Sequence, residues 1–461
     1  MLYGMSSTVS AYCQTTINYG FFSKPTLGGM QINIPQLPTF QSANPAFGQL
    51  PNMNPILPNP FAQMNSSTEE NNRKILAQMG VLSDDDLAKK REDVERDLME
   101  DKFYRDRDEW YKKTSLYRNT LAILESFNPD SFSLTKAVFL VENAFLDNKY
   151  SYGDFLNGVT IRAELVKQIL KREGLSTKNN LALNYGIQKL YQHYNQFYDA
   201  KIKKTYDVKP FGYDFDDFMG GKDYTKMFVS KLMMTGKGQC HSMPLLYLMI
   251  AEQLGAKAWL SLAPGHSFVQ FKDAKNNIVN FETTNGNLVS NNWLLQSGFI
   301  NANALKEKTY LDTLSQRKLY AHCLSDLMLG YMNKFGYDQL SDQIKRKILQ
   351  IDSTNMTALI VDANLKTMIA RQKITEAGKP KVEDLPKFPD AYKAYLDMHA
   401  AYEKVDGRGY QDMPKKAYQA WLKSIDKEKK KQKTKELNEE MQREIQRVKK
   451  LKFVVIDKTK N

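Results

Sequence analysis

The chain has 461 residues, which is long for one domain and suggests two or three. Hydrophobic residues make up 42% and charged residues 25%, as is typical of a soluble protein with real cores. Three widely separated cysteines, Cys13, Cys240 and Cys323, imply no disulfide framework, and no apolar run is long enough to span a bilayer.

Residues 1–67 are rich in Asn, Pro, Gln, Gly and Ser and carry almost no charge. Such a composition cannot bury enough apolar surface to fold, so we expect a disordered segment. It lacks a basic region followed by a continuous apolar stretch, and a secretory signal is therefore not recognisable. A cytoplasmic location is the default, and export stays open.

Residues 68–128 are predicted to be a charged helical segment. Ser83 precedes three aspartates, which is typical of a helix start, and mixed charges follow from Lys89 to Trp110. Four aromatic side chains fall within or beside this stretch, and we expect them to pack on the next domain: Phe103, Tyr104, Trp110 and Tyr111.

Residues 129–305 are predicted to form one α+β domain. Helical apolar spacing covers residues 131–145, 152–173 and 182–197, and predicts a helix-rich first lobe. The stretch 206–226, with its Gly, Asp and aromatic residues, is interpreted as a loop that leads towards a site.

Three β-prone runs follow in the same domain, at residues 258–262, 267–271 and 278–283. If the last two form a hairpin centred between Ala274 and Lys275, opposite residues have numbers that sum to about 549. His266 then faces Glu282 or its neighbour, with Cβ atoms roughly 5 Å apart for direct partners. Asn280 falls on the same face as Glu282 and is a second candidate for orienting the imidazole.

Cys240 is the candidate nucleophile. It follows a glycine-rich turn and precedes the mostly apolar run from Leu245 to Leu254, so it should lie at the start of a helix. The helix dipole and free N–H groups favour a thiolate there. A histidine and then a carboxylate follow in order, as a nucleophilic cysteine site requires.

Three short motifs around Cys240, His266 and Glu282 resemble those of a known protein superfamily. Gly238-Gln239-Cys240, Gly265-His266-Ser267 and the run Asn280 to Thr284 resemble the core of transglutaminase-like proteins. That resemblance implies a papain-like α+β fold with a small antiparallel sheet. It also implies a catalytic triad of Cys240, His266 and Glu282, with Gln239 and Asn280 in supporting roles. Glu282 stands where the superfamily usually has Asp, and Val279 or Phe281 replaces a common tryptophan.

The resemblance implies acyl transfer from an amide of a protein or peptide substrate. Water as the acceptor would make the chain a peptidase or amidase, and an amine would make it a transglutaminase. The alternative is an inactive transglutaminase-like protein that acts as an interaction module. We expect no cofactor and no metal, since no second cysteine lies near Cys240 and His241 should point elsewhere on its helix.

Residues 306–425 are predicted to be all-helical and resemble tetratricopeptide-type hairpins. Helices are expected at 320–335, 339–349 and 356–370, with Gly336 as a break, and a more divergent pair at 389–425. These helices could bind a protein partner. His322 and Cys323 are interpreted as packing residues on the first of them.

Residues 426–461 form a charged tail with a basic excess. Its acidic and basic residues alternate at helical spacing, which favours a solvated helix held by side-chain pairs. Nucleic-acid binding is the alternative for a chain of net charge +13, but aromatic residues are absent among these charges until Phe453. We therefore expect no nucleic-acid partner.

Overall fold

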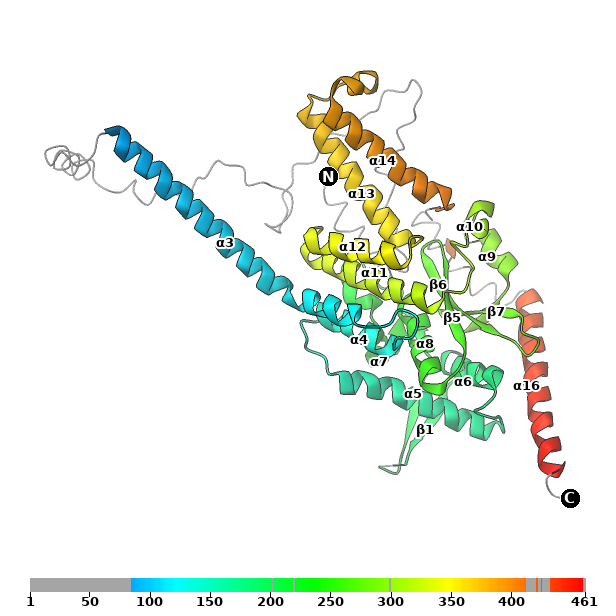
Figure 1. Ribbon diagram of the computed structural model, residues 1–461. Helices are drawn as coiled ribbons and strands as arrows, with labels where there is room; N and C mark the ends of the chain where they lie inside the picture. Colours follow the sequence, from blue (N-terminus) through cyan, green and yellow to red (C-terminus); the bar gives the residue numbers. More distant parts are fainter. Residues whose placement is uncertain are drawn as a thin grey trace.

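The first described element is α3 (Asp84–Glu125), a helix of 42 residues. This computed structural model describes residues 84–458 apart from 201, 219, 298–299, 412–419, 422–423 and 425–431. The predicted disordered segment 1–67 lies outside these residues. Tyr117, Leu121 and Leu124 are buried near the end of α3, whereas residues 105–109 are exposed. The helix therefore projects from the body of the molecule at its N-terminal end (Figure 1).

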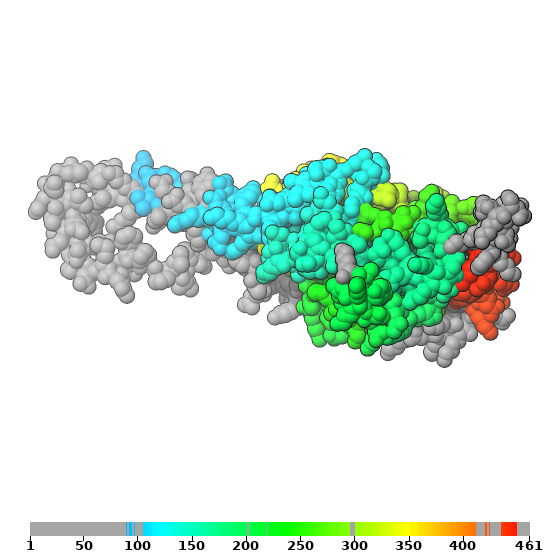
Figure 2. All heavy atoms as spheres, turned by 90° about the horizontal axis from the view of Figure 1, so that it is seen from below, coloured from blue at the N-terminus to red at the C-terminus, as the bar shows by residue number. Residues whose placement is uncertain are grey.

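Trp110 of α3 packs where two later helices meet, at the end of α11 (Gln316–Phe335) and the start of α12 (Gln339–Ile351). Its Nε1 donates a hydrogen bond to Oδ2 of Asp338 at 3.1 Å, and its ring meets Phe335 edge to face. Seen from below, α3 (blue to cyan) and the C-terminal helix (red) lie towards opposite ends of the molecule (Figure 2).

The first lobe is helical, as predicted. It comprises α4 (Leu134–Phe145), α5 (Tyr152–Arg172), α6 (Asn180–Gln192), the 3-10 helix η2 (Tyr224–Met227), α7 (Val229–Thr235) and α8 (Ser242–Leu254). Ser133, Ser151 and Asn179 cap three of these helices through their side chains. Glu252 of α8 adds a second cap to α4, because its carboxylate accepts hydrogen bonds from the backbone N–H groups of Leu134 and Thr135 at the start of that helix.

The predicted helix 182–197 was too long. α6 ends at Gln192, His193 has an extended backbone, and β1 (Asn195–Asp199) follows. Buried and exposed residues alternate along the start of β1, which is the period of a strand. β1 pairs antiparallel with β2 (Lys204–Val208), so part of the predicted loop 206–226 is a hairpin strand.

A four-stranded antiparallel sheet follows α8, in the order β5-β6-β7-β8. Its strands are β5 (Ala258–Ala263), β6 (His266–Lys272), β7 (Ile278–Glu282) and β8 (Asn287–Val289). In the β6–β7 hairpin Gln270 lies opposite Asn280, so paired numbers sum to 550 and the predicted register was off by one. The turn is shifted because Asn276 adopts a positive φ of 65° and Asp273 accepts two backbone N–H groups.

The helices after the sheet share its core. α9 (Asn291–Ser297) and α10 (Ala302–Lys306) lead to a segment that runs along β5. There the N–H groups of Leu311 and Leu314 donate to the carbonyls of Leu262 and Leu260. α11 (Gln316–Phe335) then packs on α4 of the first lobe. One apolar cluster includes Tyr247 of α8, Phe281 of β7 and Leu327 of α11.

Two helical hairpins complete this region. α11 packs on α12 (Gln339–Ile351), and α13 (Met356–Glu376) packs on α14 (Pro389–Gly407), with η3 (Val382–Lys387) between the last two. Gly336 ends α11, as expected. Much of the predicted last helix, 414–425, lies outside the described residues. In the tail, α16 (Gln432–Lys458) lies against β8.

The fold is therefore mixed α+β, mostly helical with small sheets. Among the described helices, none combines the length and the apolar character needed to cross a bilayer.

Candidate cysteine site

The chain reaches Cys240 along a short paired segment. β3 (Gly212–Tyr213) pairs parallel with β4 (Lys237–Gly238), and the N–H of Asp214 donates to the carbonyl of Gly238 at 2.9 Å. A Cβ atom at Gly238 would lie 2.8 Å from Oγ of Ser242, in the first turn of α8. Glycine is therefore needed at this position, because only a residue without a side chain allows β4 so close to α8.

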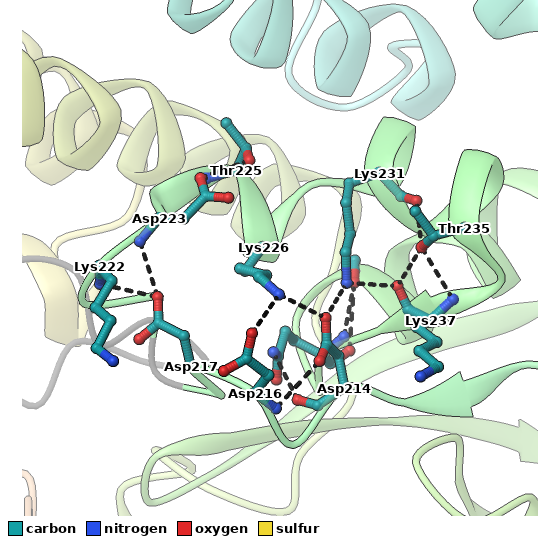
Figure 3. A network of polar contacts seen from close by, with 12 residues as sticks. Asp214, Asp216, Asp217, Lys222, Asp223, Thr225, Lys226, Lys231, Thr235 and Lys237 are labelled. Atoms are coloured by element: carbon teal, nitrogen blue, oxygen red, sulfur yellow. Dashed lines mark hydrogen bonds and ion pairs between the residues drawn. The ribbon is translucent and has the colours of Figure 1, made fainter.

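Asp214 is the centre of a polar network beside this segment (Figure 3). Its carboxylate accepts hydrogen bonds from Nζ of Lys226, at 3.2 Å, and from Nζ of Lys231. Burial alone would raise the pKa of the Asp214 carboxyl, but the two lysines outweigh burial and lower it. The backbone carbonyl of Asp214 accepts a hydrogen bond from Nε2 of Gln239 at 2.9 Å. Gln239, predicted as a supporting residue, therefore ties the turn to this network.

Cys240 lies two residues before α8, as the sequence predicted. It is fully buried, and its carbonyl oxygen accepts a hydrogen bond from Oγ of Ser267 at 2.6 Å. Ser267 follows His266 directly, so this bond fixes the start of β6 beside the start of α8.

His266 and Glu282 form a buried pair. Nε2 of His266 lies 2.6 Å from Oε2 of Glu282, and both side chains are fully buried. Oε1 of Glu282 accepts hydrogen bonds from the N–H and hydroxyl groups of Thr284, which hold the carboxylate in place. Nδ1 of His266 is buried without a hydrogen-bond partner among the described residues. The Glu282 carboxylate thus hydrogen-bonds to Nε2 and leaves Nδ1 to interact with a second group.

The strand register explains how Glu can fill this position. Continuing the observed pairing places Phe268 opposite Glu282, so His266 is the diagonal neighbour of Glu282 on the same face. Diagonal neighbours are farther apart than direct partners and suit long side chains. Asn280, the other predicted orienter, hydrogen-bonds instead to Gln270 and Asn291.

Aromatic side chains cover the site. The ring of Trp421 stands edge-on to His266, and it stacks on Trp293 with centroids 5.5 Å apart. Both tryptophans belong to a second apolar cluster that also contains Cys240, Ala263 and Phe268. Nothing in the sequence around Trp421 points to this role, since the segment lies more than a hundred residues after the sheet.

A cluster of His241, His322 and Asp326 lies beside the site. Nε2 of His241 is 3.3 Å from Oδ2 of Asp326, and all three residues are buried. Burial alone would lower the pKa of His241, but the carboxylates of Asp326 and Glu142 together outweigh burial and raise it. Burial lowers the pKa of His322, against the opposing effect of Asp326. The sequence did not suggest this cluster, because His322 was interpreted as a packing residue.

Cys323 has a free, buried thiol, and burial raises its pKa well above the ordinary value. The thiolate form is therefore disfavoured, which agrees with the prediction that Cys323 serves only in packing.

No family model matches the chain, and neither the curated proteins nor the solved structures contain a significant match.

Proposed function

We propose that the chain is a cysteine-dependent acyl-transfer enzyme with a transglutaminase-like core, in which Cys240, His266 and Glu282 form the triad. The observation that carries the proposal is the fully buried contact of 2.6 Å between His266 and Glu282. It fixes the imidazole through Nε2 and leaves Nδ1 as the nitrogen that would take the thiol proton. The hydrogen bond from Ser267 to Cys240 holds the two halves of the site together.

The reaction begins when Nδ1 of His266 takes the proton of the Cys240 thiol, and Glu282 stabilises the imidazolium. The thiolate attacks the carbonyl carbon of an amide and forms a carbon–sulfur bond. The carbon–nitrogen bond then breaks, and the imidazolium gives its proton to the departing amine. The backbone N–H of Cys240 serves as one donor to the developing oxyanion.

The acyl group leaves Cys240 in a second step. Water as the acceptor gives a carboxylic acid, which is the peptidase or amidase reaction. An amine as the acceptor gives a new amide, which is the transglutaminase reaction. A protein or peptide is the substrate class in either case.

One observation favours a second candidate, an inactive transglutaminase-like protein that acts as an interaction module. The ring of Trp421 covers the ring of His266. In that case the helical hairpins from α11 to α14 would bind a protein partner, and the buried pair would only support the fold.

Iodoacetamide labelling of the full chain separates the two candidates. The protein is first reduced and desalted, then labelled at about pH 6, and each cysteine is followed by peptide mapping. A catalytic Cys240 is alkylated much faster than a free thiol of ordinary pKa, and His266→Gln removes that excess.

Cys323 is the internal control, since its buried thiol should react slowly in the parent and in the variant. His399→Gln on α14 is the matched control for a histidine change elsewhere. Trp421→Ala uncovers the site and is labelled in parallel. Reduced Cys240 that reacts no faster than a thiol in the unfolded chain, in the parent and in Trp421→Ala alike, would refute the enzyme and favour the interaction module.

A further inference from the structure

Three elements bring groups that can bind a metal to one buried place. His322 and Asp326 are four residues apart on α11, so they lie on the same face of that helix. His241 is the N-cap residue of α8. One ligand atom from each of the three side chains lies within 4.8 Å of the other two. Two imidazoles and a carboxylate are a donor set that suits zinc.

The distances are close to those of a zinc site. The His241 and Asp326 ligand atoms are 3.3 Å apart, and those of His322 and Asp326 are 4.0 Å apart. Ligands of one tetrahedral zinc ion, with bonds of about 2.0–2.1 Å, lie roughly 3.4 Å from each other. The widest separation, at most 4.8 Å, must therefore shorten by up to about 1.4 Å, which a rotation of a histidine side chain can supply.

A cavity adjoins the cluster, and a buried oxygen in the cluster has no partner. The cavity has a volume of about 20 Å³, and Glu142, His241 and Asp326 are among its lining residues. That is room for one water-sized body. Asp326 is only 8% exposed, so water cannot readily reach its carboxylate. Its Oδ1 nevertheless has no hydrogen-bond partner among the described residues. A buried carboxylate oxygen needs a partner, and a water molecule on a cation held by Oδ2 would provide one for Oδ1.

Two other side chains that could bind a metal line the cavity, Glu142 and Cys323, but neither belongs to the cluster. Both carboxylate oxygens of Glu142 accept hydrogen bonds, from the N–H groups of Val229 and Ser230 at the start of α7. Cys323 also lines the cavity, but its sulfur is not among the ligand atoms that lie within 4.8 Å of one another.

We propose that His241, His322 and Asp326 bind one Zn²⁺ ion, with a water molecule in the adjoining cavity as the fourth ligand. The ion fastens the start of α8, directly after Cys240, to α11. The competing arrangement is metal-free, with the His241–Asp326 ion pair alone linking the two helices. This inference does not depend on the proposed catalysis, because neither zinc binding nor its test involves the reactivity of Cys240.

Zinc titration of the full chain tests the site. Chelator-treated protein is titrated with Zn²⁺ in competition with a chromogenic chelator. We expect one equivalent to bind, and Mg²⁺, which prefers oxygen ligands, not to compete. His322→Gln and Asp326→Asn should each weaken zinc binding by more than roughly 100-fold. Loss of a residue that only hydrogen-bonds to a metal ligand already costs about 10- to 100-fold, and loss of a ligand itself costs more. His399→Gln, a matched change on α14, leaves the affinity unchanged.

Parent affinity in both ligand variants, or no stoichiometric zinc in the parent, would overturn the proposal. X-ray absorption at the zinc edge of the loaded parent chain needs no variant. We expect only nitrogen and oxygen neighbours at about 2.0–2.1 Å, and a sulfur neighbour near 2.3 Å would refute this ligand set.

Discussion

The ring of Trp421 stands edge-on to the ring of His266, with centroids 4.5 Å apart and planes at 74°. Trp421 is 4% exposed, and His266 and Cys240 are fully buried. Neither His266 nor Cys240 is therefore open to a substrate carbonyl in this conformation. If the chain is an enzyme, the cover over this pair, of which Trp421 is a part, must move during turnover.

Removing this indole should expose the site. We expect Trp421→Ala to increase the rate at which iodoacetamide labels reduced Cys240, and to lower the free energy of unfolding by about 3 kcal/mol. Peptide mapping and urea denaturation measure the two effects. Trp110→Ala on α3 is the control, because it removes a tryptophan far along the chain from the cysteine. An unchanged labelling rate in a folded Trp421→Ala protein would show that the indole does not limit access.

The length of Glu282 should matter as much as its charge. Glu282→Asp shortens the side chain by one methylene and cannot span the diagonal to His266, so we expect slower labelling of reduced Cys240 at pH 6. Glu282→Ala leaves a buried imidazole without its carboxylate and should cost about 3 kcal/mol or more in stability. Asn280→Ala is the control on the same strand, and its labelling rate should match that of the parent. Equal rates in Glu282→Asp and the parent would contradict the diagonal geometry.

Asp214 should make stability depend on pH in acid. Its folded pKa lies below the ordinary value of 3.8, so the unfolded chain binds the proton more readily. The stability from its lysine pairs is present above pH 3.8 and is lost as the pH falls through the folded pKa. We expect Asp214→Asn to lose about 2 kcal/mol at neutral pH and to lack this acid-side decline.

Asp216→Asn is the matched control for Asp214, because Asp216 binds the same Lys226 but its side chain is 82% exposed. Its stability should change by less than about 1 kcal/mol. Urea denaturation of the three proteins between pH 3 and pH 7 provides the comparison. A parallel acid decline in the parent and Asp214→Asn would count against the lysine pairs as its source.

Lys345 should be a strong link between the two helical hairpins. It lies on α12, and its Nζ is 2.9 Å from Asp342 and 2.8 Å from Asp362 of α13. Lys345→Met would leave two partly buried carboxylates without this cation and should cost about 3 kcal/mol in urea denaturation. Lys366→Met, which removes a more exposed partner of Asp362, should cost less than about 1 kcal/mol. Similar losses in both variants would show that burial of the cation is not decisive.

The sequence predicted the local features of the site well. Apolar periodicity located most of the helices, and the β-prone runs located β5, β6 and β7. The contact between His266 and Glu282 is found in the structure, although the hairpin register was off by one. The error arose from the turn, where the positive φ of Asn276 and the Asp273 hydrogen bonds shift the centre to Lys275. Both registers kept Glu282 within reach, because its side chain is long.

Features that depend on distant parts of the chain were not predictable in this way. His241 and Asp326 are separated by more than eighty residues, and only the packing of α11 on α4, which itself packs on α8, brings them together. Trp421 reaches His266 across an even longer separation. Helical spacing also continued past the end of α6 and concealed β1, since Phe197 fits the apolar pattern of either a helix or a strand.

The long helix α3 has a mechanical consequence. Residues 84 to 110 of this helix span about 40 Å at a rise of 1.5 Å per residue. Trp110 is fastened to Asp338 and Phe335, so the helix is held at a point far from its start. Asp84 therefore lies at the outer end of a long helical arm that is anchored on α11 and α12. A force applied to that end would act on these two helices, at a distance from the cysteine site.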